Sequence, residues 1–386
     1  MKKKLYLSKR NIEDISSLLL MLCLNFGTIY TISLGTKKFN FSYSEFFLYI
    51  FLLCFIFNKK LKIYFKLNNY ILFKFIFVIY IIFVNFWADS ISANLSINYY
   101  FIVGLISYVF FLNIFIQTDS LYSKGLRIFG LALSLSIIFI FLYNIIFVYN
   151  LFDVRFYELK KSISVPLGSS NFLALFLNFM FFYEIISKKK HWSGYSFIYI
   201  LALLFTLSRG GYIAFFIGIF LLILFNIILM NNYKLGFIFL FVFIISSLII
   251  FYLSNNFFDL TTFSSVFTRL EIWRDRINLF LQNPIFGSGY QYENITNSHN
   301  IILTLLSSYG IVGFLLCMVY FGNLILLSFK YYMKKFSYNS LKFLVPLLVV
   351  FIHSLIEPFF LSAESQIFMS AFYANLYKEL ILLNRK

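Results

Sequence analysis

The position of Arg209 in the sequence predicts a chemical role. It lies in the segment FTLSRGGYIAF, with an apolar run on each side and Gly210 and Gly211 directly after it. Consecutive glycines permit a tight turn and close backbone approach. An arginine inside a membrane costs about 3 kcal/mol and usually faces a cavity or a partner. A guanidinium fixed at such a turn can bind a phosphate through two parallel hydrogen bonds, although a snorkelling arginine at a simple turn is the alternative.

A second basic group follows in the segment SSVFTRLEIWRDRINLFLQNP. Its apolar residues recur in steps of three and four, which predicts an amphipathic helix lying along the membrane surface. Arg269 and Arg276 are seven residues apart and share one face, while Trp273 belongs to the apolar stripe. Arg274 can pair with Glu271 one turn earlier. These residues are candidates for binding an anionic substrate, and the alternative is the ordinary basic surface of an interfacial helix. Pro284, Gly287 and Gly289 follow this segment and predict a tight reversal of the chain.

His299 is the residue whose type suits proton transfer. It stands in TNSHNIILTLL, where a polar segment becomes an apolar run, and Asn300 follows it. If Asn297 or Ser298 caps the helix, His299 lies in the first turn, where the helix dipole favours a neutral imidazole. A neutral ring at a water-accessible rim can accept a proton from a hydroxyl. The alternative is a histidine that serves as a polar interface residue.

Two further groups are candidates for contacts with the substrate. His353 and Glu357 are four residues apart in HSLIEP, so they share one helical face and can assist the same site or bond to each other. Arg155, Lys160 and Lys161 lie in a loop that precedes SVPLGSSN. Such a loop can face an anion, or its charges can simply be solvated.

The elements that position these residues are membrane helices. The chain has 386 residues, 61% hydrophobic and 12% charged, whereas the surface of a soluble protein needs roughly 25% charged residues. Apolar runs of about 20 residues recur along it. The net charge of +17 is spread in short clusters between these runs, a pattern of membrane topology rather than of nucleic-acid binding. The three cysteines lie within apolar runs, so neither a disulfide framework nor a metal site is expected.

We predict an all-α polytopic membrane protein with about twelve transmembrane helices in a single domain, residues 1–386. The helices are expected at residues 15–34, 43–57, 70–87, 97–116, 126–149, 170–187, 193–207, 211–229, 236–254, 300–327, 342–357 and 364–383. With the N-terminus inside, 23 Lys and Arg residues fall on inner segments and 9 on outer ones, which places both termini in the cytoplasm. Residues 255–299 then form a large outer loop between helices nine and ten.

Three segments, in this order, resemble the O-antigen ligase/polymerase superfamily of bacterial envelopes: TLSRGGYIAF, TRLEIWRDRINLFLQNPIFGSGY and SHNIILTLLSSYGIVGFLLCMVYF. The pattern of the family falls on Ser208-Arg209-Gly210, on Arg269 with Trp273, on Pro284 with Gly287 and Gly289, on His299-Asn300, and on Gly310 with Gly313. The resemblance covers residues 200–325 and leaves the first five helices without a counterpart.

The resemblance implies a C-type glycosyltransferase-like fold in the bacterial cytoplasmic membrane and a sugar donor attached to undecaprenyl pyrophosphate, with no metal and no cofactor. It implies that Arg209 and Arg269 hold the pyrophosphate and that His299 activates the acceptor hydroxyl. The chemistry agrees, because fixed guanidinium groups stabilise a departing diphosphate. The expected partners are the lipid-linked glycan donor and acceptor, membrane lipids, a chain-length regulator and a flippase, and no nucleic acid.

Three functions stay open on the sequence. A polymerase of O-antigen or capsule repeat units is favoured, because the outer loop is compact and the composition resembles that of low-GC polysaccharide gene clusters. An O-antigen ligase has the same motifs and differs in its acceptor. A polysaccharide flippase would suit the helices too, but the irregular features concentrate between residues 205 and 300 and have no counterpart in residues 1–150.

Overall fold

The computed structural model describes residues 18–26, 28–34, 37–57, 68–88, 90–116, 121–148, 156–188, 193–230, 264–290, 299–355 and 357–384. Five helices of this part are long and apolar enough to cross a membrane. They are α4 (Ile91–Phe115), α5 (Leu121–Tyr143) with its π-helical continuation (Asn144–Val148), α7 (Ser170–Ser187), α9 (Arg209–Leu229) and α12 (Ile301–Lys335). The chain is therefore a multi-pass membrane protein.

Shorter helices complete the bundle and confirm most of the predicted segments to within a few residues. They are α2 (Tyr43–Phe57), α3 (Asn69–Val84), α8 (Gly194–Phe205), α13 (Leu341–Ser354), preceded by η4 (Tyr338–Ser340), and α14 (Ala363–Asn384). The amphipathic segment forms α11 (Ser264–Gln282), as predicted, and a short helix α6 (Phe156–Ser162) precedes α7. The predicted helix at 236–254 lies outside the described residues, and a total of twelve spans stays a prediction.

The predicted span at 15–34 is wrong in its second half. After η1 (Leu24–Phe26) the chain forms strand β1 (Thr28–Leu34), which pairs antiparallel with β2 (Lys37–Ser42). The sequence of β1, TIYTISL, is dominated by β-branched residues, which favour extended backbone. Hydropathy alone does not separate such a strand from a helix. A second small sheet pairs β3 (Ser164–Val165) with β4 (Gly168–Ser169).

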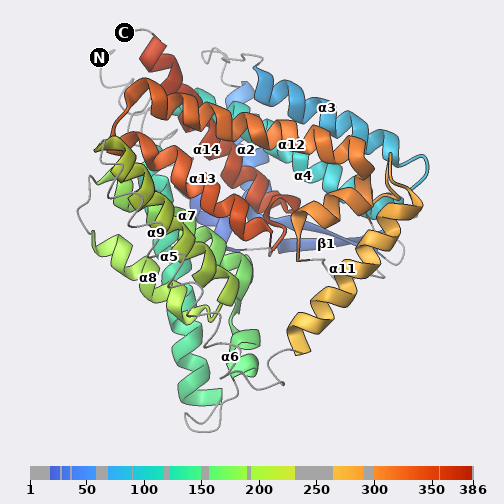
Figure 1. The fold of residues 1–386 in the computed structure, drawn as a ribbon, viewed down its shortest axis with the longest axis horizontal. Coiled ribbons are helices and arrows are strands. Elements are labelled where there is room, and N and C mark those ends of the chain that lie inside the picture. Colours follow the sequence, from blue (N-terminus) through green and yellow to red (C-terminus); the bar gives the residue numbers. More distant parts are fainter. Residues whose placement is uncertain are drawn as a thin grey trace.

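The helices form two groups (Figure 1). In one, α12 packs along α3, and α4 packs against both α3 and α14. In the other, α13 packs between α7 and α9, and α8 packs against α5 and α7. Helix α11 packs on α12 near one end and extends away from the rest of the bundle. The candidate residues for chemistry come from both groups and from α11.

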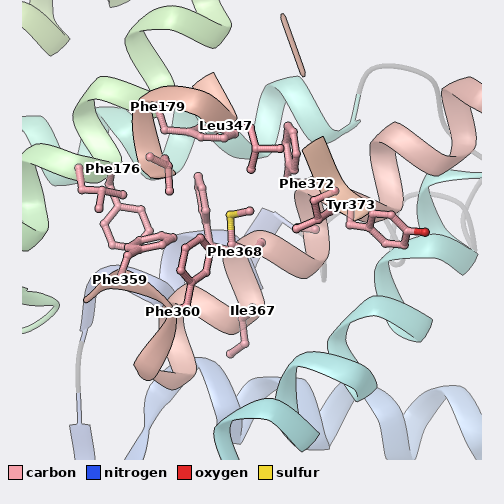
Figure 2. Close-up of a cluster of buried hydrophobic side chains, with 14 of the residues drawn as sticks. Phe176, Phe179, Leu347, Phe359, Phe360, Ile367, Phe368, Phe372 and Tyr373 are labelled. Atoms are coloured by element: carbon pink, nitrogen blue, oxygen red, sulfur yellow. The ribbon is translucent and has the colours of Figure 1, made fainter. Parts of the chain in front are cut away.

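A cluster of buried aromatic side chains joins α7 and α14 to the turn η5 (Phe359–Leu361), as Figure 2 shows. The ring of Phe176 lies 5.0 Å from that of Phe359 and 5.0 Å from that of Phe368. Phe360 packs on Phe321 of α12 at 3.8 Å. Each such pair contributes about 0.5–1.5 kcal/mol beyond the burial of its area. Since η5 begins two residues after Glu357, this packing holds the backbone close to that residue.

Lys74 occupies an unexpected position. Lys74 is one of the 23 basic residues that were predicted to lie on inner segments. In the structure it lies in α3 and is fully buried. Its ammonium nitrogen lies 5.6–5.9 Å from the ring centroids of Tyr70, Phe101 and Tyr320, which is the range of cation–π contacts. Without Lys74, the predicted inner segments still contain more Lys and Arg residues than the outer ones.

Candidate active site

The Ser-Arg-Gly segment forms the turn between α8 and α9, as predicted. Ser208 is the N-cap of α9, and its hydroxyl oxygen accepts a hydrogen bond from the backbone N–H of Gly211 at 3.1 Å. A side chain at position 211 would place its Cβ 2.6 Å from that of Ala174 in α7, so glycine is needed for the close approach. Arg209, the first residue of α9, is exposed at this end of the helix.

A chain of hydrogen bonds connects this turn to His299. The hydroxyl of Ser208 donates to Oδ1 of Asn171 at 2.8 Å, and Nδ2 of Asn171 donates to Oε2 of Glu357 at 3.4 Å. The same carboxylate oxygen lies 3.0 Å from Nδ1 of His299. The relay therefore joins the starts of α7 and α9, the turn after α13, and the residue before α12.

The protonation of Glu357 decides which nitrogen of His299 is available. Burial raises the pKa of Glu357, but the hydrogen bond and the charge of His299, together with the bond from Asn171, outweigh it and leave the pKa below its ordinary value. An ionised carboxylate only accepts hydrogen bonds, so Nδ1 of His299 is the donor. In the neutral ring, Nε2 then carries the lone pair. This is the arrangement of a base oriented by a second group.

His299 does not lie in the first turn of its helix, so that part of the prediction is wrong. The N-cap of α12 is Asn300, whose Oδ1 accepts from the backbone N–H groups of Ile302 and Leu303. Asparagine is among the best capping residues, which explains the later start. His299 stands just before the cap with a positive φ of 50° and a side chain that is 31% exposed. Its ring is thus positioned by Glu357 rather than by the helix.

Lys160 lies within electrostatic range of Glu357 and of two other predicted basic residues, Arg209 and Arg269. Burial lowers the pKa of Lys160 in α6, and the nearby charges of Arg269 and Arg209 lower it further, while Glu357 raises it. Such effects require each of the three charged groups to lie within electrostatic range of Lys160. Segments that are more than 100 residues apart in sequence are thereby brought to one place. The excess of positive charge favours an anion such as a diphosphate.

Comparison with known proteins identifies part of the chain. The family model described as O-antigen ligase matches residues 194–318. This stretch is an O-antigen ligase family domain. The resemblance inferred from the three motifs is thus confirmed. The domain runs from the start of α8 through α9 and α11 into α12 and contains Arg209, Arg269 and His299. No curated protein matches the chain.

Three residues of the site lie outside the O-antigen ligase family domain: Lys160, Asn171 and Glu357. The first and the last are among the residues predicted from the sequence. For Glu357, the prediction left open whether it assists the site or bonds to His353, and its bond to His299 favours the first alternative. Asn171 was missed. The only signal for it was its position at the start of a predicted helix, directly after the basic loop.

The remaining predicted residues are less closely tied to His299. Lys161 and Arg274 are exposed, and Trp273 is half-buried on α11. Arg276 is 3% exposed and lies 3.4 Å from the hydroxyl of Ser307, so it packs α11 against α12. Arg155 lies outside the described residues. Contacts of these five residues with a substrate stay predictions.

Two predicted ion pairs or bonds are not formed. Arg274 and Glu271 are both exposed and make no ion pair in the described structure. His353 is fully buried in α13, and its ring nitrogens have no hydrogen-bond partner there. Its link to Glu357 is through the backbone, where the N–H of Glu357 donates to the carbonyl of His353 at 3.0 Å. The side chain of Glu357 is turned to His299 instead.

A backbone clasp holds the end of α11 against a kink in α12 within the family domain. Gly287, Gly289 and Gly310 all have positive φ, at 74°, 84° and 62°. The N–H of Gly289 donates to the carbonyl of Ser308 at 2.8 Å, and the N–H of Ile311 donates to the carbonyl of Pro284 at 2.9 Å. The predicted tight reversal is therefore confirmed. The clasp ties α11, which carries Arg269, to α12, whose start carries His299.

Gly310→Ala is expected to destabilise the protein by about 1–3 kcal/mol, because the new side chain meets both a strained backbone conformation and a steric clash. Its Cβ would lie 2.3 Å from the carbonyl oxygen of Ile285. Thermal unfolding in detergent measures the effect as a lower midpoint. Gly322→Ala on the same helix is the control, since nothing lies within 4 Å of a Cβ there. Equal midpoints for the two variants would contradict the clasp.

Asn171→Ala is expected to lower activity several-fold and to move the acid limit of the protein's stability toward higher pH. The amide of Asn171 is one of the groups that keep the pKa of Glu357 low, so without it the carboxylate protonates at a higher pH. The stability due to this depressed pKa is present above the ordinary value for glutamate and is lost as the pH falls through the folded value. Thermal unfolding measured from pH 4 to 8 tests the shift, with Asn226→Ala on α9 as the control. An unshifted acid limit would show that Asn171 does not act through Glu357.

Proposed function

We propose that this protein is a glycosyltransferase that polymerises undecaprenyl-pyrophosphate-linked oligosaccharide units into O-antigen or capsular polysaccharide. The reaction takes place at the outer face of the cytoplasmic membrane, where the predicted topology puts the ends of the helices that carry the site. The observation that supports this most directly is the His299–Glu357 pair, with Lys160 within electrostatic range of Glu357, Arg209 and Arg269. A base that is oriented by a carboxylate can activate an acceptor hydroxyl, and nearby cations can bind a diphosphate. Together these groups suit the transfer of a glycan from a lipid diphosphate to a hydroxyl.

The residues have separate tasks in the reaction. Nε2 of His299 takes the proton from the acceptor hydroxyl as its oxygen bonds to the anomeric carbon of the donor sugar. The bond from that carbon to the diphosphate breaks, and the leaving oxygen keeps the electron pair. Arg209 and Arg269 hold the diphosphate and stabilise its growing charge, and Lys160 adds a third cation. A lipid diphosphate is already a good leaving group, so the step needs no metal.

An O-antigen ligase is the second candidate, because the family model that matches residues 194–318 carries that description. The ligase uses the same donor and the same base but transfers the finished glycan to lipid A-core. The residues described above serve either reaction, since both acceptors present a sugar hydroxyl. The compact outer loop at residues 255–299 is the reason for placing the polymerase first.

Deletion of the gene, followed by electrophoresis of the lipopolysaccharide or capsule, tests the proposal. A polymerase predicts a core that bears a single repeat unit. A bare core with polymer stranded on the lipid carrier would instead identify a ligase. Loss of lipid-linked glycan from the outer leaflet would contradict both and indicate a flippase. Complementation with the intact gene is the control for each outcome.

A further inference from the structure

A cavity of about 310 Å³ borders Glu357, the carboxylate partner of His299, and the proposed mechanism does not use it. Its wall is built by the starts of α4 and α7, by the β3–β4 hairpin, and by the segment between α13 and α14. Tyr290, which follows the glycine clasp, closes it on another side. Glu357 is itself part of the wall, so a molecule in this cavity lies next to the group that positions the base.

The charge of the cavity argues against a second diphosphate site. Its wall includes two carboxylates, Glu357 and Glu364, and none of the described residues that line it is a lysine or an arginine. Like charges repel strongly in such a partly enclosed space. The cations Lys160, Arg209 and Arg269 do not line it. The diphosphate and the contents of this cavity are therefore expected to occupy separate places around Glu357.

The chemistry of the wall fits a saccharide. The aromatic residues Tyr100, Phe172 and Tyr290 can pack against the apolar face of a sugar ring. The Glu364 carboxylate and the Ser362 hydroxyl can accept hydrogen bonds from sugar hydroxyls. The volume lies at the lower end of the range of roughly 300–1,000 Å³ for small-molecule sites, which suits a mono- or disaccharide unit.

We propose that this cavity binds the acceptor sugar and that Glu364 is a specificity-determining residue that recognises its hydroxyls. The inference rests on the proposed function, because it assigns the second substrate of the same site. The donor sugar is covalently bound to the diphosphate and must stay with the cations. The acceptor is the substrate whose hydroxyl has to reach the ring of His299. Glu357, which is hydrogen-bonded to that ring, forms part of the cavity wall.

Binding to the full-length protein in lipid nanodiscs tests the assignment. The probes are undecaprenyl pyrophosphate and the methyl glycosides of the sugars found in the host polysaccharide and core, with binding of the glycosides followed by saturation-transfer NMR. At least one glycoside is expected to bind, and Glu364→Gln is expected to weaken it about tenfold, the effect of losing a hydrogen bond to a charged group. Glu271→Gln, which changes an exposed carboxylate on α11, is the control and should bind as the wild type does.

The outcomes separate the acceptor site from the proposed function. Undecaprenyl pyrophosphate should bind normally to the Glu364→Gln variant and weakly to the Arg269→Ala variant. The glycoside should bind weakly to Glu364→Gln and normally to Arg269→Ala. If no glycoside binds, or if Glu364→Gln binds it as the wild type does, the acceptor site is wrong although the proposed function stands. If undecaprenyl pyrophosphate does not bind the wild type, the proposed function itself is wrong. Ser362→Ala provides a second variant should Glu364→Gln fail to fold, and wild-type glycoside affinity in it would also count against the site.

Discussion

His299→Ala is expected to reduce glycan transfer by about 10²–10⁴-fold, the usual contribution of a general base. The ring is partly exposed, at 31%, and lies outside the helices, so the variant is expected to reach wild-type levels in the membrane. Its loss removes the group that takes the proton from the acceptor hydroxyl, while the cations that hold the donor remain. The measurement is the amount and length of glycan made by a deletion strain that carries the variant gene, with protein level checked by immunoblot.

Two further variants show that the effect comes from proton transfer. Glu357→Gln keeps the shape of the side chain that contacts His299 but removes its negative charge. The ring of His299 should stay in place, while the hydrogen bond that its Nδ1–H donates to residue 357 becomes weaker. Its activity should fall between that of the wild type and that of His299→Ala. His191 lies outside both the family domain and the described residues and is the control. The His191→Ala variant should have wild-type glycan transfer activity. A His299→Ala strain that makes glycan of normal length would refute the assignment of the base.

The sequence contains enough to predict the parts of this site that are local. The periodicity of α11, the turn at Ser208-Arg209-Gly210 and the reversal at Gly287 depend on residues that are near one another in the chain, and the structure confirms all three. All three lie within residues 194–318, the range that the O-antigen ligase family model matches.

The parts that could not be predicted depend on contacts between distant residues. The bond between Asn171 and Glu357 joins positions 186 apart, and no spacing rule places them together. The capping of α12 by Asn300, rather than by an earlier residue, moved His299 out of the helix and gave it the conformation that reaches Glu357. Strand β1 was mistaken for a span because apolar content was read without the excess of β-branched residues. A reading that weighted strand propensity would have found it.

Arg269→Ala is expected to lower activity by about 10²–10³-fold, similar to the loss of one fixed donor from a site that stabilises a developing anion. The residue lies half-buried on α11 and within electrostatic range of Lys160. We expect a bound diphosphate to contact both cations. Arg269→Lys should recover only part of the loss, because a lysine keeps the charge but cannot form two parallel hydrogen bonds to a phosphate.

Arg274 on the same helix provides the matched control for Arg269. It is exposed, belongs to another face of α11 and makes no described ion pair, so Arg274→Ala should change activity by no more than a few-fold. A general loss of positive charge would affect the two variants alike and would be relieved by lowering the ionic strength. A specific diphosphate contact predicts a large difference between them at every salt concentration. Equal activities would show that α11 attracts the substrate only through its overall charge.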